Sequence, residues 1–487
     1  MPNKIAEKLI RRLEELAEDP DPNPPKLKGA RRKRKYEHDI SMHARVRHDA
    51  AGQLLALLGP KAYLNESRIL RALDKSTLDY QRSRQQVRTK GMMDRLQHVP
   101  EYIIDMPQLI RSEVRGIAKV LRDAEIRKVK VYGVGGSATP AGIAREIIEN
   151  SGRLGYDFEV VRRDTPRFES VDDATLLIFA SFSGNTEETL NCFERALKRK
   201  HPTDHMIAMS KGGKLKTMAA DSKVPWIRIP ARIRQPRESM VFQLTAILSV
   251  VSALKLPSGG SRAPFEVDDA MLDAAKRRLE GMRGELHWDV RFEANRAKQI
   301  AAKLVCGDVN AAKAGAYGAP WTRPCIPIVL SSASNQAVAY EFYTQLCEAS
   351  KIVCHVATYP EALHNLVECM KFNLVSGAGV PWSLYFLESA DDTPRVARRW
   401  RATLKEIFPD VAWCSFKAEG DTAFERALSG YYFNAWLRLY MAFLNGAEPL
   451  PVPTMDYMKD YMAGIPRKPR RPGSKPGRSG KRPSRPR

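Results

Sequence analysis

The chain has 487 residues, 43% of them hydrophobic, and a formal net charge of +23. This length exceeds that of one ordinary domain and the apolar content suffices for packed cores, so we expect two or three domains. Residues 26–35 hold seven Lys and Arg and residues 467–487 hold ten, with no acidic residue in either segment. Since these carry seventeen of the twenty-three charges, the rest is only mildly basic, which argues against a nucleic-acid-binding core.

Cysteine usage and hydropathy exclude two further classes of protein. The seven cysteines are scattered, without a Cys-x-x-Cys pair, which argues against a disulfide framework and against a zinc site. The sequence has no run of 18 apolar residues, and its first twenty residues lack the apolar stretch of a signal peptide. We therefore expect a cytoplasmic protein with no membrane span and no bound metal.

The N-terminal part is predicted to be a helical and basic extension over residues 1–104. Residues 5–17 have helical periodicity, which ends at the proline-rich breaker 19–25. After about residue 105 the pattern changes to helices that alternate with apolar strands. This alternation is typical of a parallel sheet covered by helices.

The first α/β region is predicted to span residues 105–258. Its helices are expected at 107–122, 139–151, 187–200 and 213–220, and its strands at 129–133, 157–162, 176–180, 205–210 and 226–229. A Gly- and Ser-rich linker follows at 256–262.

A second region of the same kind is predicted over 265–462. Its strands are expected at 326–331, 352–357, 382–387 and 411–416, and its helices around 337–348 and 395–407. Residues 463–487 then form a basic tail, which we expect to be disordered. Without aromatic residues for stacking on bases, this tail offers only a nonspecific attraction to anionic polymers or surfaces.

Residues 181–189, Ser-Phe-Ser-Gly-Asn-Thr-Glu-Glu-Thr, lie between a buried strand and a helix. The first backbone N–H groups of a helix have no partner within the helix and attract anions. Ser181, Ser183 and Thr186 would add hydroxyl donors that suit a phosphate monoester. The alternative is an ordinary helix cap, because Ser, Asn and Thr are common capping residues.

The glycine-rich loop at 133–138 also joins a strand to a helix. It fits the loose dinucleotide pattern Gly-x-Gly-x-x-Ala, with Asp164 near the end of the next strand. Arg162 and Arg163 flank that position, and a dinucleotide site has no need of a second anion-binding turn after the third strand. A phosphosugar loop, a tight βα turn and a dinucleotide loop are thus the three interpretations.

Together, the Gly-Gly-Ser-Ala of 135–138, the motif at 181–189 and the Gln-Pro-Arg of 235–237 resemble the sugar isomerase (SIS) family. Most narrowly, they resemble its bifunctional phosphoglucose/phosphomannose isomerases. Residues 348–351 and 360–365 extend the resemblance, which covers roughly residues 105–462.

The resemblance implies two SIS domains, each a flavodoxin-like three-layer α/β/α sandwich with a mainly parallel sheet. It implies a homodimer with shared active sites and a cofactor-free, metal-independent aldose–ketose isomerisation. The substrates would be glucose 6-phosphate and fructose 6-phosphate, with mannose 6-phosphate second, which places the enzyme in carbohydrate metabolism at glycolysis or gluconeogenesis. Gly136, Ser137, Ser181, Ser183 and Thr186 would bind the substrate phosphate.

Four catalytic residues follow from the same resemblance. Glu348 would be the base that moves a proton between C2 and C1 through a cis-enediol, a task suited to a partly desolvated carboxylate. His364, contributed by the partner subunit, would open the sugar ring. Arg237 would stabilise the enediolate with a permanent positive charge, and Lys459 would bind the ring or C1 oxygen.

Simpler interpretations stand beside these roles. Glu348 could be a surface glutamate, with Glu341 and Glu361 as competing carboxylates, and His364 and Lys459 could be ordinary helix-start and surface residues.

The sequence also departs from the family pattern. Cys347 and Ala349 replace two asparagines that flank the family's base, and the threonine expected near 450–452 is absent. A non-catalytic sugar-phosphate-binding regulatory protein is therefore the leading alternative function, and a nicotinamide-dependent oxidoreductase is the third.

Overall fold

The computed structural model describes residues 126–151, 157–161, 171–231, 235–254, 267–306, 325–376, 382–407, 411–445 and 452–462, and single residues at 96, 99, 117, 121, 233, 447 and 449. The predicted N-terminal extension, most of the helix predicted at 107–122, the linker and the basic tail lie outside the described residues. The chain divides into two units, 1–449 and 450–487, and each is described by itself. The domain boundaries proposed from the sequence stay predictions.

The first sheet is parallel throughout and has the strand order β2-β1-β3-β4-β5, the flavodoxin-like doubly wound order. Every residue of β3 is buried, because a central parallel strand is covered on both faces. β1 runs between β2 and β3, so that Lys128 lies opposite both Asp157 and Thr175. The strands are β1 (Lys128–Tyr132), β2 (Asp157–Val161), β3 (Thr175–Ser181), β4 (Met206–Ser210) and β5 (Trp226–Arg228).

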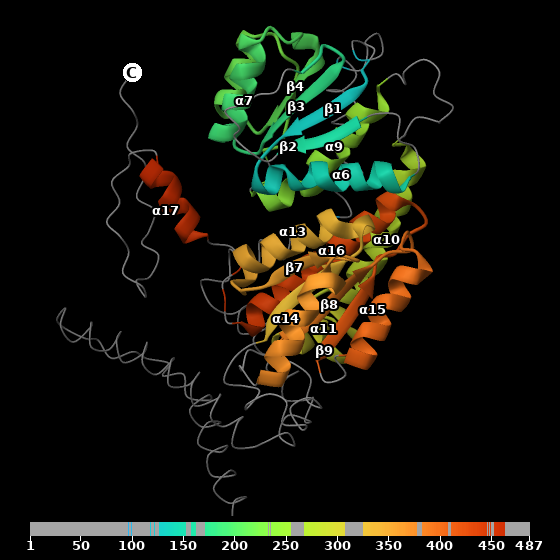
Figure 1. The fold of residues 1–487 in the computed structure, drawn as a ribbon. Helices are drawn as coiled ribbons and strands as arrows, with labels where there is room; N and C mark the ends of the chain where they lie inside the picture. The colour runs from blue at the N-terminus through green and yellow to red at the C-terminus, as the bar shows by residue number, and fades with distance from the viewer. Residues whose placement is uncertain are drawn as a thin grey trace, which may run out of the picture. The chain divides into compact units, whose positions relative to one another are not determined.

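Helices cover both faces of this sheet (Figure 1). On one face, Phe179 of β3 stacks on Tyr132 and meets Phe193 of α7 edge to face, with ring centroids 5.1 Å apart in each pair. On the other face, α6 and α9 pack against each other. The helices are α6 (Thr139–Asn150), α7 (Glu187–Lys198), α8 (Gly213–Asp221) and α9 (Met240–Ser252).

The second sheet repeats the order of the first four strands as β7-β6-β8-β9, again parallel. Trp400 of α15 stacks on Phe386 of β8 on one face, and Phe433 of α16 stacks on Phe416 of β9, with centroids 4.2 and 3.8 Å apart. The strands are β6 (Ile326–Ser331), β7 (His355–Thr358), β8 (Trp382–Glu388) and β9 (Ala412–Lys417). The helices are α10 (Asp269–Leu286), α11 (Arg296–Cys306), α13 (Gln336–Gln345), α14 (Ala362–Ser376), α15 (Pro394–Ile407) and α16 (Ala423–Leu444).

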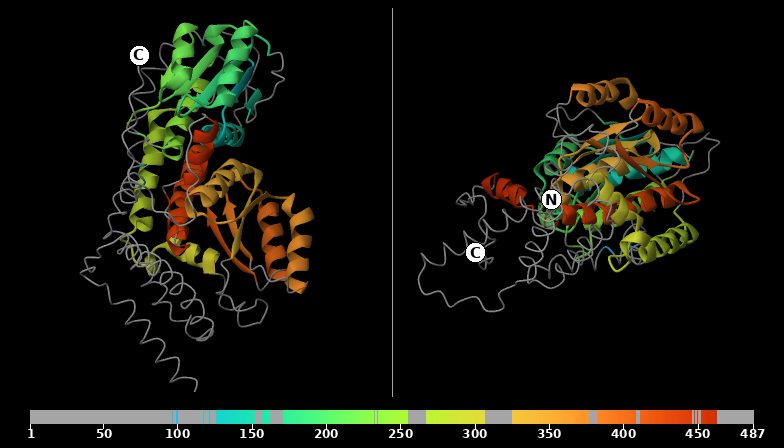
Figure 2. Two further views of the ribbon diagram at one scale, coloured as in Figure 1. Left: turned by 90° about the vertical axis from the view of Figure 1, so that its left-hand side faces the viewer. Right: turned by 90° about the horizontal axis from the view of Figure 1, so that it is seen from below.

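The two sheets are separate, one drawn in blue-green to green and the other in orange (Figures 1 and 2). Helix α6 of the first half packs against α13 and α16 of the second. Glu146 Oε1 accepts a 2.6 Å hydrogen bond from the backbone N–H of Ala337, and Asn150 Nδ2 donates to Ser334 O at 3.0 Å. These bonds join α6 to the start of α13, so both halves of the first unit meet at the helices that follow β1 and β6.

Helix α16 is buried along nearly its whole length, because its own residues are largely apolar on every face. It begins with a capping box, in which Glu425 N donates to Thr422 Oγ1 and Thr422 N donates to Glu425 Oε1. Arg438, 4% exposed, lies near its C-terminal end. A charged residue at such a position requires a buried partner.

The α/β fold class predicted from the sequence is confirmed, with local differences. The helix predicted at 337–348 ends as α13 at Gln345 and continues as a π-helical turn, Leu346–Ser350. Lys351 then takes the left-handed conformation at φ 55°, and β7 begins at His355 instead of 352. The sequence did not predict α10, α11, α14 or α16, nor α17 (Pro453–Met462) in the second unit.

None of the helices in the described part of the chain is long and apolar enough to cross a membrane.

Candidate functional site

The hydroxyl-rich turn after β3 is stabilised by its own first serine. Ser181 is fully buried, and its Oγ accepts hydrogen bonds from Gly184 N at 3.1 Å and Thr186 N at 3.4 Å. The hydroxyls of Ser181 and Thr186 share a further bond of 2.8 Å. Thr186 is the N-cap of α7, and its side chain makes no capping hydrogen bond.

Ser183 is the exposed hydroxyl of this turn. Its Oγ accepts from Asn185 N at 3.1 Å, which leaves the hydroxyl hydrogen available to donate. The turn thus combines a donor that faces solvent with the N-terminus of α7. Both features suit an anion.

The turn at 181–186 interlocks with the turn between β4 and α8. Leu215 N donates to Gly184 O at 2.9 Å, and Lys211 N donates to Phe182 O at 3.0 Å. Gly184 has φ +70°, and a Cβ there would lie 1.7 Å from Gly212 O. Gly213 has φ +73°, and a Cβ there would lie 2.4 Å from Ser183 O. Only glycine fits either position.

The glycine-rich loop after β1 lies against the same turn. Ser137 is buried, and its Oγ accepts from Phe182 N at 3.0 Å. A Cβ on Gly136 would lie 3.2 Å from Cβ of Pro236, so the two loops are in close contact. The structure therefore brings together the predicted phosphate-binding residues and the segment that carries Arg237.

Arg237 lies in the short 3₁₀ turn Pro236–Ser239 and is 8% exposed. Its Nε donates to Gln235 Oε1 at 2.7 Å, and its Nη1 donates to Pro449 O at 3.3 Å. The Tyr431 hydroxyl donates to Arg237 O at 3.2 Å, which ties this turn to α16. Burial, and then the positive charge of Arg438, lower the pKa of Arg237 to about 10, so the guanidinium stays charged at neutral pH.

Two carboxylates face these guanidinium groups. Glu341 of α13 is 4% exposed, and its Oε1 lies 3.8 Å from Arg438 Nη1. Burial, together with the negative charge of Glu348, raises the pKa of Glu341 to about 7 against the opposing effect of Arg438 and Arg237. Glu348 is half-buried in the π turn, and its charge stabilises the charged form of Arg237.

The other two predicted catalytic residues are His364, in the same unit, and Lys459, in the second unit. His364 is exposed in the first turn of α14, and its backbone N–H donates to Glu361 O at 2.9 Å. Within the described residues, no hydrogen bond or ion pair connects His364 with Glu348. Lys459 lies on α17, in the unit that is described separately. The roles of both residues stay predictions.

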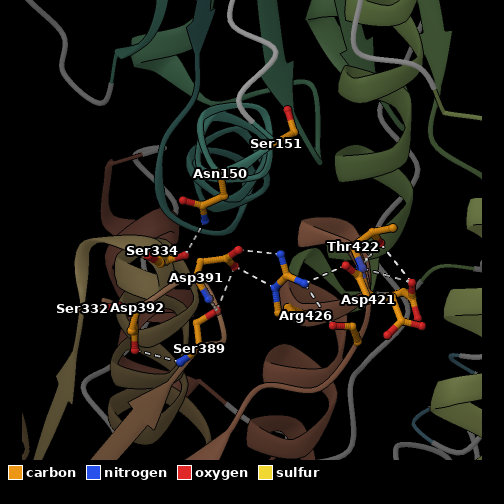
Figure 3. Close-up of polar contacts among 12 residues, drawn as sticks. Asn150, Ser151, Ser332, Ser334, Ser389, Asp391, Asp392, Asp421, Thr422 and Arg426 are labelled. Carbon is orange, nitrogen blue, oxygen red and sulfur yellow. Dashed lines mark hydrogen bonds and ion pairs between the residues drawn. The ribbon is translucent and has the colours of Figure 1, made fainter. Parts of the chain in front are cut away.

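The second half has a different set of side chains at the corresponding corner, after β6 and β8 (Figure 3). The Asp392 carboxylate accepts from the Ser332 hydroxyl and, at 2.9 Å, from Ser389 N. Asp391 accepts from Arg426 Nε at 2.7 Å and from Arg426 Nη2 at 2.5 Å. The serine hydroxyl and backbone N–H that could bind an anion here are already bonded to carboxylates of the chain itself.

Sequence reasoning missed Arg438 and Gln345, which line the carboxylate cluster. Arg438 Nη1 donates to Gln345 Oε1, one helical turn before Glu348. A signal was present: Arg438 is a lone charged residue within the apolar run 431–443. A long apolar segment with one arginine indicates a buried and paired guanidinium.

Comparison with known proteins identifies relatives over most of the chain. Residues 310–462 match the family model described as the bacterial phospho-glucose isomerase C-terminal SIS domain. A bifunctional phosphoglucose/phosphomannose isomerase of Caldicellulosiruptor bescii is 26% identical over 371 residues, which is 75% of this chain and 99% of the relative. One of Aquifex aeolicus is 28% identical over 332 residues, covering 68% and 88%.

Solved structures share the fold at low sequence identity. A hypothetical protein of Thermus thermophilus has a TM-score of 0.54 and 16% identity, covering 83% of this chain and 96% of that chain. The tagatose-6-phosphate ketose/aldose isomerase of Escherichia coli has a TM-score of 0.50 and 16% identity, covering 73% and 94%. The resemblance stated from the motifs is confirmed: along most of its length, this chain is similar to the bifunctional phosphoglucose/phosphomannose isomerases of the SIS family.

Proposed function

We propose that this protein is an aldose–ketose isomerase of hexose 6-phosphates, which interconverts glucose 6-phosphate and fructose 6-phosphate. The observation that carries the proposal is the position of Arg237. Its turn touches the glycine-rich loop through Pro236 and Gly136, while the negative charges of Glu348 and Glu341 stabilise the charged form of its buried guanidinium. One residue thus connects an anion-binding turn with a carboxylate cluster, as a phosphosugar isomerase requires.

In the proposed reaction, the phosphate is bound by Ser183, Thr186 and the loop of Gly136 and Ser137, while the fully buried Ser181 holds the turn through its own hydrogen bonds. Glu348 takes the proton from C2 of the open-chain aldose and returns it to C1, while the hydroxyl proton of O2 passes to O1, which gives the ketose through a cis-enediol. Arg237 stabilises the negative charge that develops on the enediolate oxygen.

Ring opening precedes the proton transfer. We assign it to His364, whose side chain is exposed on α14 and therefore accessible to a second copy of the chain. In this proposal the enzyme is a cytoplasmic homodimer, in which the partner's histidine completes each site and Lys459 binds the ring or C1 oxygen. The basic tail contacts anionic polymers without selecting a sequence.

A non-catalytic sugar-phosphate-binding protein is the second candidate. One observation favours it: no hydrogen bond from Cys347 or Ala349 orients the Glu348 carboxylate among the described residues, and His364 is not joined to it. A carboxylate in a variable position would leave phosphate binding intact without turnover.

The deciding experiment is a coupled assay of fructose 6-phosphate conversion to glucose 6-phosphate in the presence of EDTA, with a calorimetric titration of the same sugar. Turnover supports the isomerase, and mannose 6-phosphate is then tested as a second product. Binding without turnover supports the non-catalytic sugar-phosphate-binding protein. If NADPH raises the melting temperature and sugar phosphates do not, both proposals fail and a nicotinamide enzyme is indicated.

A further inference from the structure

Glu348 lies in the middle of a π-helical turn, Leu346–Ser350, which interrupts the regular end of α13. Such turns depart from the α-helical hydrogen-bond pattern and occur often at functional sites. The neighbours Cys347 and Ala349 offer no strong hydrogen-bond donor to the Glu348 carboxylate. The position of this carboxylate therefore depends on how the turn itself is held.

Both ends of the turn are held by one residue of α16. Arg438 donates from Nη1 to the side chain of Gln345, the residue before the turn. The carbonyl oxygen of Arg438 accepts a 2.7 Å bond from Oγ of Ser350, the last residue of the turn. Arg438 and Ser350 are 4% and 0% exposed, so neither bond competes with solvent.

A second residue, just past the end of α16, holds the exit of the turn. Asn445 Nδ2 donates to Ser350 O at 2.9 Å and to Lys351 O at 3.2 Å. Residues seven apart lie on the same face of a helix, so Asn445 and Arg438 meet the turn from one side. Asn445 supplies a partner for carbonyl groups that the end of a helix leaves unbonded.

The charge of Arg438 is balanced within the same cluster. Its Nη1 lies 3.8 Å from Glu341 Oε1, and a buried guanidinium without a carboxylate partner would be strongly destabilising. Glu341, Gln345 and Glu348 follow one another at helical spacing. Arg438 thus pairs with Glu341 and Gln345, which both precede the turn that carries Glu348.

We propose that Arg438, Ser350 and Asn445 are positioning residues that clamp the Leu346–Ser350 turn onto α16 and thereby fix Glu348 for proton transfer. This inference rests on the proposed isomerase function, in which Glu348 is the base. It assigns the orientation of the base to the long buried helix of the second half. None of the three residues needs to touch the sugar.

The test compares Ser350→Ala with Ser383→Ala. The two serines are matched, because both are fully buried and each donates a 2.7 Å bond to a backbone carbonyl on another element, Arg438 O and Leu304 O respectively. We expect Ser350→Ala to lower kcat about tenfold while KM and the fructose 6-phosphate Kd change less than twofold. Ser383→Ala should lower the unfolding midpoint similarly and leave kcat within twofold.

Two further variants and one physical readout keep the test decisive. Asn445→Ala, at a partly exposed position, should shift kcat in the same direction as Ser350→Ala. The double variant Arg438→Met with Glu341→Gln removes both charges together, so that no unpaired buried charge prevents folding, and it should lower kcat further. Amide hydrogen exchange over residues 346–351 should rise in Ser350→Ala and not in Ser383→Ala.

The outcomes separate the two proposals. If the wild-type protein binds the sugar without turnover, the proposed function fails, while the exchange data still decide whether the clamp exists. If the wild type turns over and Ser350→Ala loses no more kcat than Ser383→Ala, the positioning role is overturned. Unchanged hydrogen exchange in the turn would also overturn it.

Discussion

The corners after β1 and β3 in the first half, and after β6 and β8 in the second, occupy the same place in two sheets of the same strand order. In the first corner, Ser183 is exposed beside the N-terminus of α7, and its Oγ accepts from a backbone N–H instead of donating to a carboxylate. In the second corner, Asp391 and Asp392 already bind the available donors, and Arg426 neutralises Asp391. Equal topology has produced one open, hydroxyl-rich turn and one closed ion-pair cluster.

This difference indicates a division of tasks between the halves. In the proposed function the first half binds the phosphate, whereas the second half contributes carboxylates from α13 and the π turn that follows it. Arg237 belongs to the first half in sequence and is tied to the second by Tyr431. The predictions below break or sharpen this comparison, beginning with the largest effect.

Glu348→Gln should remove the catalytic contribution of the second half and leave phosphate binding by the first half unchanged. Removing a general base costs up to about 10⁴-fold in rate, so we expect kcat to fall by about 10³-fold or more in the coupled assay. The calorimetric Kd for fructose 6-phosphate should stay within twofold, because the phosphate is held elsewhere. Glu361→Gln, an exposed carboxylate of the same half, is the control. Equal losses in both variants would contradict the assignment.

Asp391→Ala should break the closed corner without affecting the open one. Arg426 and Asp391 are 12% and 17% exposed, and removing one partner of such a pair costs about 3 kcal/mol of unfolding free energy. Urea unfolding measures this loss, and sugar binding should not change. Arg127→Ala removes an exposed pair with Asp172 at 3.9 Å and should cost less than about 0.5 kcal/mol. An altered sugar Kd in Asp391→Ala would refute the separation of the corners.

Ser183→Ala should weaken the open corner. A hydrogen bond to a charged group is worth about 1.5–3 kcal/mol, so we expect KM and Kd to rise about tenfold or more with kcat within twofold. Ser332→Ala removes a hydroxyl from the closed corner and should leave KM unchanged. If Ser332→Ala raised KM as much as Ser183→Ala, the phosphate would not be confined to the first half.

The smallest effect is a pH dependence of stability caused by Glu341, which faces Arg438, Arg237 and Glu348. Its pKa rises from the usual 4.5 to about 7 in the folded protein. The folded state therefore binds the proton more tightly, and this stabilisation is fully present below about pH 4.5 and lost as pH rises through about 7. Between pH 6 and pH 8, the loss of this stabilisation amounts to about 1 kcal/mol of unfolding free energy.

Urea unfolding of the wild type and of Glu341→Gln at both pH values isolates this contribution, because groups that do not interact with Glu341 titrate alike in the two proteins. The wild type should lose more stability than the variant on going from pH 6 to pH 8. Parallel changes in the two proteins would show that Glu341 does not titrate in this range.

The sequence predicted the parts of the fold that local patterns encode. The strand predicted at 326–331 coincides with β6, since a continuous apolar run between turn residues is typical of a buried parallel strand. It did not predict α16, because a helix that is apolar all round lacks the amphipathic period. The lone Arg438 was the available signal.

The sequence predicted the parts of the site that are formed by residues close together in the chain. The hydroxyl-rich turn at 181–186 and its junction with α7 follow from the order of residues, whereas its contact with the β4–α8 turn joins residues some thirty positions apart. The π turn at Glu348 depends on Arg438 and Asn445, about ninety positions later, so local propensity could not reveal it. Phosphate binding, catalysis, His364 and Lys459 stay predictions.

The mutual fit of Gly184 and Gly213 has a consequence for protein design. Because each glycine would collide with the backbone of the other's turn if it carried a Cβ, the two loops form one unit that spans two successive βα segments. A designer who transplants the 181–186 loop into another α/β scaffold must therefore transplant residues 210–215 with it. Grafting the serines alone would reproduce the motif without its shape.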